Sequence, residues 1–409
     1  MLEPERQTRA DLLTAAGIAV LVLLAALVVW VNSGARQTDS ATAATTVAPP
    51  PAAGTVPVAL RELWQVPDPV STRVLLSGAV LITGDGGTVT GRDAGTGAEL
   101  WHYRRDLPLC GLETQFGTVI ATYRDERGCS QTTMLAADTG ARRTARSSYL
   151  DGEIRLTVDG TYTLAAGDRR LEVWRSDLVR TLEYGYVDAP VNVKTQPRHG
   201  CELRSAASSA SRLAVLERCP GDASPRLTVL DPAPKDNTVP EEFGSRVLTG
   251  PGADAPGARV LAVTEDRVLV ALPGGPGPDG TVATPRLEVF DGTGNGVTTH
   301  ELSAPLAESA TLTRIGSAAL LFTGNSVIAL NVSSFDPLWV ATEAIGSPAI
   351  MAGRLLLPAP GAVLVLDPIT GEVLGRIPVD RGASTGPVAL AVSGSTVLEL
   401  RDGRVHALG

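Results

Sequence analysis

The sequence predicts an all-β protein, an eight-bladed β-propeller preceded by one transmembrane helix. Eight short segments with alternating apolar residues each run into a turn, and they recur about every 45 residues, a period typical of radial β-repeats. The chain also contains 43 Gly and 29 Pro among 409 residues, which suits many short strands joined by turns. The eight segments are residues 88–93, 134–136, 171–175, 227–231, 287–291, 327–331, 363–367 and 405–409.

Each repeat is expected to form one blade of four antiparallel strands, named a to d from the centre outward. In blade three the four strands are expected at 153–157, 162–164, 171–174 and 179–182. The turn after strand c reads Asp-Ala-Gly-Thr-Gly at Asp93–Gly97. Asp can accept hydrogen bonds from the backbone two residues further on, and Gly adopts the positive φ that such a turn needs.

The last repeat ends at Gly409 directly after its strand c, so it lacks an outer strand. Residues 61–66 read Arg-Glu-Leu-Trp-Gln-Val and resemble residues 98–103, which form strand d of blade one. An N-terminal strand that pairs with the last blade would close the ring and remove an exposed sheet edge. We therefore predict a propeller over residues 58–409 whose outermost strand in blade eight comes from the N-terminal side.

Residues 12–31 form an uncharged run of 20 residues, long enough to cross the hydrocarbon core of a bilayer as a helix. The alternative is a cleaved secretory signal, whose apolar core is usually shorter. Arginines flank the run mainly on its N-terminal side, so residues 1–11 are predicted to be a short cytoplasmic tail and the propeller to lie outside the plasma membrane. Residues 32–57, rich in Ala, Thr and Pro, are expected to be an extended linker of up to about 80 Å.

The four cysteines of an exported domain are expected to form two disulfides. Cys110 lies just before strand a of blade two and Cys129 just after its strand b, while Cys201 starts strand a of blade four and Cys219 ends its strand b. In an antiparallel pair the start of one strand adjoins the end of the next, so Cys110–Cys129 and Cys201–Cys219 are the favoured pairs, both on one rim. Metal binding is disfavoured, because the cysteines lack close CxxC spacing.

The repeat resembles the pyrroloquinoline-quinone-like (PQQ-like) propellers, whose blades combine Asp-x-x-Thr-Gly with a following x-x-Leu-Trp strand. The match covers residues 58–409 and is best in blades one and seven, at Asp93–Trp101 and Asp367–Gly371. That family includes quinone-dependent dehydrogenases and non-enzymatic envelope scaffolds, among them a lipoprotein that assists outer-membrane protein assembly. The resemblance therefore implies the fold and leaves the function open.

Several classes of function have little support in the sequence. A net charge of −9 without a basic cluster argues against a nucleic-acid partner. The adjacent cysteine pair that family dehydrogenases often carry is missing, and so is any CxxCH haem motif. The four histidines share no motif, and Trp64, Trp101 and Trp339 are expected to pack blades together. We assign no catalytic, cofactor-binding or metal-binding residues and expect no cofactor.

We expect a membrane-anchored, monomeric, non-enzymatic scaffold that binds one or more cell-envelope proteins. Long b–c insertions are expected at 220–225 and 273–285, and the charged segment Arg124, Asp125, Glu126 and Arg127 is expected to lie in the b–c loop of blade two. These loops would share the face of the cysteines, and this face over blades two to five is the predicted partner surface. The alternatives are a quinone-dependent oxidoreductase and a small-ligand sensor, each using the central channel.

Overall fold

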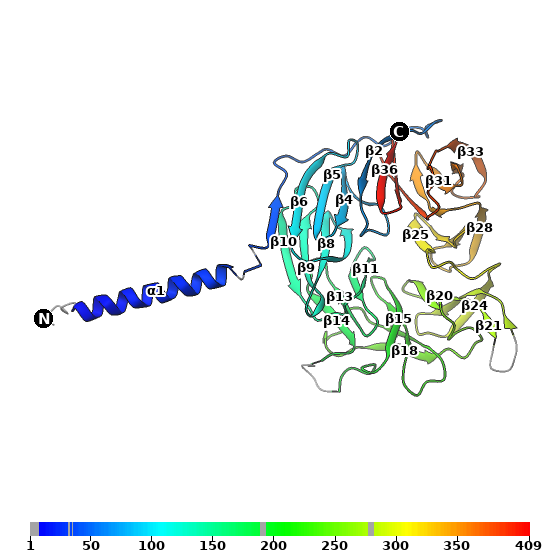
Figure 1. The fold of residues 1–409 in the computed structure, drawn as a ribbon. Coiled ribbons are helices and arrows are strands. Elements are labelled where there is room, and N and C mark those ends of the chain that lie inside the picture. Colours follow the sequence, from blue (N-terminus) through cyan, green and yellow to red (C-terminus); the bar gives the residue numbers. More distant parts are fainter. Residues whose placement is uncertain (1–7, 32, 35, 189–193, 277–281) are drawn as a thin grey trace.

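The computed structural model describes residues 8–31, 33–34, 36–188, 194–276 and 282–409. Figure 1 shows the strands arranged as a ring, with the helix α1 (Arg9–Val31) outside it. No side chain of α1 is buried, and its most apolar window has a mean hydropathy of 2.9. This helix has the length and composition of a membrane anchor or a signal sequence.

The ring consists of eight antiparallel sheets, which confirms the predicted eight-bladed propeller. In blades one to seven the four strands follow the order a to d along the chain. Blades one to four contain β3 (Leu75–Ser77), β4 (Val80–Asp85), β5 (Thr88–Asp93), β6 (Glu99–Arg105); β7 (Leu109–Gln115), β8 (Thr118–Asp125), β9 (Gly128–Ala136), β10 (Arg142–Ser147); β11 (Arg155–Val158), β12 (Thr163–Ala166), β13 (Arg170–Trp174), β14 (Arg180–Gly185); and β15 (Glu202–Ser208), β16 (Leu213–Arg218), β17 (Arg226–Leu230), β18 (Glu242–Val247).

The second half of the ring repeats this arrangement. Blades five to eight contain β19 (Arg259–Val263), β20 (Arg267–Leu272), β23 (Arg286–Asp291), β24 (Gly296–Glu301); β25 (Thr311–Ile315), β26 (Ala318–Phe322), β27 (Ser326–Asn331), β28 (Pro337–Thr342); β30 (Ala349–Met351), β31 (Arg354–Ala359), β32 (Ala362–Leu366), β33 (Val373–Pro378); and β34 (Val388–Ser393), β35 (Thr396–Arg401), β36 (Arg404–Leu408) with β2 (Glu62–Pro67). Blade five carries the additional hairpin β21 (Gly275–Pro276) and β22 (Val282–Ala283), and β29 (Gly346–Ser347) pairs in parallel with β34.

Ring closure follows the sequence prediction. The N-terminal strand β2 pairs antiparallel with β36, with Trp64 opposite Ala407 and Val66 opposite Val405. The backbone N–H of Arg61 also donates to the carbonyl of Gly409, at 2.9 Å. The outer strand of blade eight is therefore supplied by the N-terminal side of the domain, and the two ends of the propeller hold each other.

The segment expected to be a free linker is docked on the propeller for most of its length. Its residues Thr38–Ala41 form β1, a fifth strand on the outer edge of blade one that pairs with β6. Further on, the N–H of Ala43 donates to the carbonyl of Thr139 in blade two, and Ala53 and Val56 pack against the core between blades seven and eight. We call residues 38–60 the N-terminal strap. The prediction of an extended spacer over 32–57 is wrong for the strap, because strand pairing and small apolar contacts hold it.

Tryptophans of the outer strands join neighbouring blades, as predicted. Trp101 of blade one is 1% exposed, and its indole N–H donates to the carbonyl of Ala137 in the c–d turn of blade two, at 3.0 Å. Gly140 of that turn has φ +71°, and a Cβ there would lie 2.6 Å from the indole. Trp64 and Trp339 make the same contact with the c–d turns of blades one and seven. The Gly of the turn is thus required both for backbone conformation and for space.

In blade six the c–d turn carries Phe335 where the turns of blades one, two and seven carry Gly. Phe335 adopts φ +60° and is fully buried among Leu287 and Val289 of blade five. The outer strand of blade five has no tryptophan to dock on this turn. The large side chain therefore comes from the turn instead of the strand, and the same inter-blade space is filled from the opposite side.

Candidate functional site

The two faces of the ring are built from different connections. Because the strands of a blade alternate in direction, the b–c turns and the d–a loops that join blades lie on one face, and the a–b and c–d turns lie on the other. The first of these faces carries both cysteine pairs. We call this face over blades two to four the disulfide face; it includes Cys110 and residues 124–129, 148–154, 167–169, 186–188, 194–201 and 219–225.

The first predicted disulfide, Cys110–Cys129, is formed, with a Cα–Cα distance of 5.9 Å. Cys110 lies at a bulge in β7, between Leu109 and Gly111. Cys129 belongs to strand c, β9, and not to a connection just after strand b as predicted. The b–c connection of blade two is thus a tight turn, because β8 extends through Asp125 and β9 begins at Gly128. The disulfide joins the start of strand a to the start of strand c, next to the b–c turn.

The second predicted disulfide, Cys201–Cys219, joins the same two connections in blade four, with a Cα–Cα distance of 4.2 Å. Cys201 directly precedes β15 and Cys219 directly follows β16, the neighbouring strand ends on which the prediction was based. Glu217 lies close enough to both sulfur atoms to resemble a metal ligand set. Because the two sulfurs are bonded to each other, they offer no thiolate ligands there.

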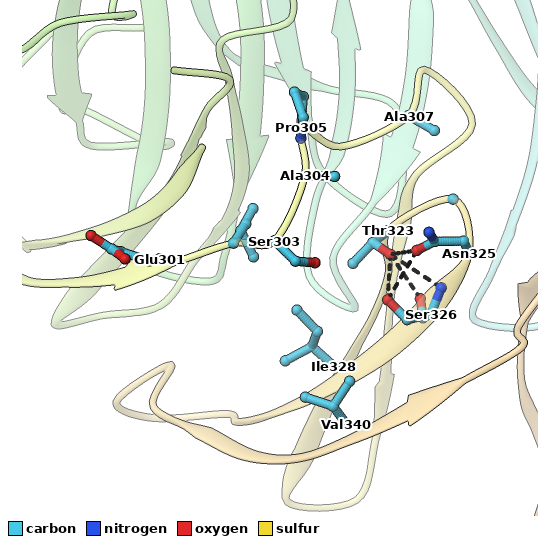
Figure 2. A pocket seen from close by; sticks show the side chains of 12 residues that line it. Glu301, Ser303, Ala304, Pro305, Ala307, Thr323, Asn325, Ser326, Ile328 and Val340 are labelled. Atoms are coloured by element: carbon cyan, nitrogen blue, oxygen red, sulfur yellow. Dashed lines mark hydrogen bonds between the residues drawn. The ribbon is translucent and has the colours of Figure 1, made fainter. Parts of the chain in front are cut away.

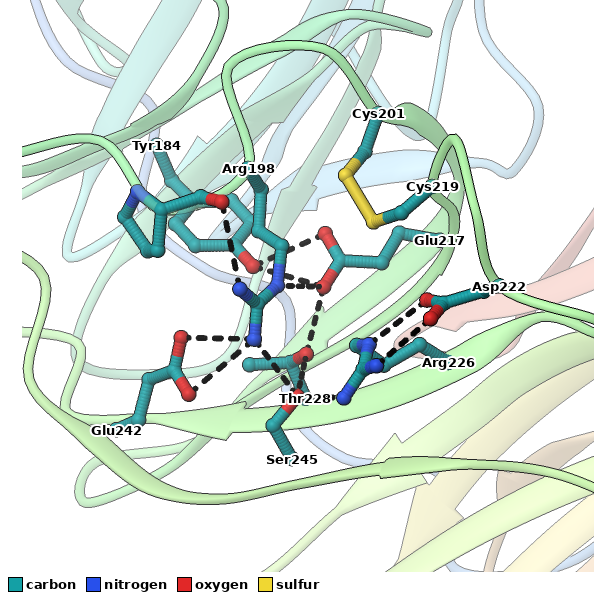
Figure 3. Close-up of a disulfide and its surroundings, with 11 residues drawn as sticks. Tyr184, Arg198, Cys201, Glu217, Cys219, Asp222, Arg226, Thr228, Glu242 and Ser245 are labelled. Carbon is teal, nitrogen blue, oxygen red and sulfur yellow. Dashed lines mark hydrogen bonds and ion pairs between the residues drawn. A yellow bond between two sulfur atoms is a disulfide. The ribbon is translucent and has the colours of Figure 1, made fainter.

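A buried hydrogen-bond network holds Arg198, in the described part of the d–a loop between blades three and four (Figure 3). Arg198 of this loop donates from Nε to Glu217 at 3.0 Å, and its Nη2 atom lies 3.0 Å from the Glu242 carboxylate. Glu217 also accepts from the hydroxyls of Tyr184 and Thr228, at 2.9 and 2.6 Å. Burial raises the pKa of Glu217 above its ordinary value, although the hydrogen bonds act against this effect. Residues 194–201 of this connection are therefore held against blade four.

A second buried carboxylate, Glu172 in β13, holds blades two and three together. It contacts Arg146 of blade two and Arg170 of its own blade, and it accepts from the indole of Trp174 at 2.8 Å. Burial opposes ionisation of Glu172, but the surrounding guanidinium groups and the indole outweigh burial and lower its pKa. A fully buried carboxylate with several charged partners stiffens this part of the ring.

Two Arg–Tyr stacks lie on the disulfide face, and sequence reasoning did not find them. Arg127 lies over the ring of Tyr149 at 5.4 Å, and 58% of Tyr149 is exposed. Arg169 lies over Tyr186 at 4.1 Å, and the ring of His199 lies 4.8 Å from that of Tyr186. In both stacks the arginine comes from a b–c turn and the tyrosine from the following d–a loop.

The four residues of the predicted partner surface do lie on the disulfide face. Arg124, Glu126 and Arg127 are exposed, and Asp125 is half-buried at the end of β8. Asp125 accepts from Arg127 Nη2 at 3.0 Å. Burial raises the pKa of Asp125, but hydrogen bonds from Ser130 and Arg127 outweigh it and hold the pKa well below its ordinary value. The segment forms a hairpin end and not the insertion loop that we expected.

The blade-five insertion is partly ordered as the hairpin β21–β22, while residues 277–281 lie outside the described residues. A cavity of about 450 Å³ lies between blades five and six (Figure 2). Leu302, Ile328 and Val340 provide its apolar wall, and Thr323 and Ser326 on its rim bond each other at 2.7 Å. Its only titratable lining residue is Glu301. This lining contains no nucleophile paired with a base.

The four histidines are separated, as predicted. His102 lies beside Glu99 on blade one, His300 lies near Asp336 and His406 beside Glu62 at the ring closure. His199 alone belongs to the disulfide face, through its contact with Tyr186.

Comparison with known proteins supports the fold. No family model matches the chain, and no curated protein matches it. Among solved structures, BamB from Moraxella catarrhalis aligns at a TM-score of 0.52 and 15% identity over 85% of this chain and 99% of BamB. The computationally designed Ika8 protein aligns at a TM-score of 0.54 and 17% identity, over 85% of this chain and 99% of Ika8. The C-terminal WD40 domain of Sif2 aligns at a TM-score of 0.54 and 12% identity, over 87% of this chain and 99% of that domain. The chain has a β-propeller fold shared with proteins of very different sequence.

Proposed function

We propose that this protein is a non-catalytic scaffold that binds a cell-envelope protein through the disulfide face. One observation carries the proposal: both disulfides and both Arg–Tyr stacks lie on the same face over blades two to four, in the d–a and b–c connections or at the strand ends beside them. Loops that are already ordered lose little conformational entropy when a partner binds. Arg and Tyr are also among the side chains that contribute most to protein interfaces.

The proposed location is the extracytoplasmic side of the plasma membrane, with α1 as a single-pass anchor. The two disulfides support an oxidising compartment, and the 23 residues of α1 are long enough to span a bilayer. The likeness to BamB supports the fold on which this proposal is built. The more specific proposal is membership of a membrane-anchored, non-enzymatic branch of the PQQ-like propellers.

The test is recovery of partners from host membranes after mild crosslinking, followed by mass spectrometry. Arg127→Glu should reduce recovery of a specific envelope protein at least tenfold, equivalent to about 1.4 kcal/mol. The matched control is Arg175→Glu, because Arg175 pairs with Asp177 in an exposed turn on the opposite face much as Arg127 pairs with Asp125. Equal recovery from both variants would contradict the assignment of the binding face.

A further inference from the structure

The strap shortens the connection between the membrane helix and the propeller. Helix α1 ends at Val31 and the first paired residue of the strap is Thr38. The seven Cα–Cα steps between them span at most about 25 Å when fully extended. If α1 is the anchor, the propeller is held close to the bilayer and cannot move away on a long linker.

The strap also fixes where the chain enters the propeller. Thr38 pairs with Arg105, the last residue of β6, whereas Ala41 pairs with His102 further back along that strand. The N–H of Asp106, in the loop from blade one to blade two, donates to the carbonyl of Gln37 at 3.2 Å. Strand d ends at the d–a loop, so the chain enters at the edge of the face that carries the disulfides.

We propose that the disulfide face is turned toward the membrane and that its partner is an acidic extracytoplasmic segment of an integral membrane protein. This inference rests on the proposed scaffold function and adds the class of partner. The short connection holds Thr38, at the edge of blade one, within about 25 Å of the end of α1. An extracytoplasmic segment that emerges from the membrane beside α1 can then reach the Arg–Tyr stacks while its own membrane-spanning part stays in the bilayer.

The charges of this side favour an acidic protein segment. Among the described residues, the guanidinium groups of Arg124 and Arg169 form no ion pair, and Arg169 is exposed beside Tyr186. Such groups match carboxylates in bidentate hydrogen bonds. Exposed Glu126 and Asp168 lie beside these arginines in the sequence. A uniformly anionic lipid surface would attract the arginines but repel the two carboxylates. A protein segment can place charges to match this alternation.

The first test measures orientation in full-length protein reconstituted in nanodiscs. A fluorescent amino acid replaces Glu126 on the disulfide face or Thr370 in a c–d turn of the opposite face, and headgroup-quencher lipids are added. We expect at least threefold stronger quenching at position 126 than at position 370. Equal quenching, or stronger quenching at 370, would overturn the proposed orientation.

The second test lengthens the connection by 20 Gly/Ser residues between Gln37 and Thr38, leaving the strap intact. The matched control places the same insertion between Lys235 and Asp236, in the exposed c–d loop of blade four. A photo-crosslinker at position 126 should capture a protein that resists carbonate extraction. Effective concentration falls with roughly the −3/2 power of tether length, and the insertion lengthens the tether from seven to 27 Cα–Cα steps. The crosslinking yield should therefore fall about eightfold in the protein with the longer connection and stay unchanged in the control.

The outcomes separate this inference from the scaffold function. A soluble partner that is lost in Arg127→Glu but unaffected by the longer connection keeps the scaffold and overturns the membrane partner. Adducts with lipid alone overturn it in favour of direct contact with the bilayer. If the crosslinker at position 126 captures no protein in either insertion variant, both the scaffold function and this inference fail.

Discussion

Asp68 lies at the point where the ring closes, between β2 and β3, and is fully buried. Its N–H donates to the carbonyl of Gly403 in blade eight, and its Oδ1 accepts from the N–H of Gly84 in blade one, at 2.8 and 2.9 Å. Its Oδ2 has no hydrogen-bond partner among the described residues. Burial raises the pKa of Asp68 to about 6, although the backbone hydrogen bond from Gly84 lowers it.

A raised pKa means that the folded protein binds this proton more tightly than the unfolded chain does. The contribution of Asp68 to stability is therefore complete below the unfolded pKa of 3.8 and is lost as pH rises through about 6. A difference of about two pKa units corresponds to about 3 kcal/mol in full, of which about 1.4 kcal/mol is lost between pH 5 and 7.5. The closure of the ring is thus predicted to weaken toward alkaline pH.

The assay is urea unfolding followed by tryptophan fluorescence at pH 5 and pH 7.5. Asp68→Asn removes the titrating group, so the change in the free energy of unfolding between these pH values should be smaller by about 1.4 kcal/mol than in the unmodified protein. The control is Asp402→Asn. Asp402 lies in the exposed b–c turn of blade eight next to the ring closure, and its φ of +49° is one that Asn adopts readily. An unchanged pH dependence in Asp68→Asn would refute the assignment.

Three further predictions concern the contacts that hold the ring. Trp101→Ala should lower the free energy of unfolding by about 4 kcal/mol, because it opens a cavity beside Gly140 and removes the bond to Ala137; chemical denaturation measures this. Replacing Cys110 and Cys129 by Ser should cost about 3 kcal/mol for a loop of this length, and a comparison of melting curves with and without reductant checks it independently. Replacing Thr38–Ala41 by Gly residues should increase hydrogen exchange in β6, whose outer edge they pair, while exchange in β28 stays unchanged.

The repeat and its closure could be predicted because they depend on strong local signals. Alternating apolar residues, Asp and Gly in the c–d turns and the repeated Leu-Trp strand each act within one blade. The disulfide pairs followed from topology alone, since Cys201 and Cys219 flank neighbouring strand ends. In blade two the same reasoning gave the right pair although Cys129 lies in strand c, because the tight b–c turn keeps it near Cys110.

The strap could not be predicted, because its contacts leave little trace in the sequence. Strand β1 is held by backbone hydrogen bonds, and three of its four residues stay exposed, so it has no apolar alternation. Ala53 and Val56 are small residues in a Pro-rich stretch that is typical of linkers. The Arg–Tyr stacks were missed for a related reason: Arg169 and Tyr186 lie in different connections and meet only once blade three has formed.

The most direct test of the binding face is a photo-crosslinking amino acid placed at Tyr149 and, for comparison, at Phe116. Both are exposed aromatic residues of blade two or its following loop, at 58% and 62%, but Phe116 lies in the a–b turn on the opposite face. In host cells, position 149 should capture one reproducible envelope protein, and position 116 should not. Capture of that protein from position 116 and not from 149 would contradict the account, because the partner would then bind the face without the disulfides.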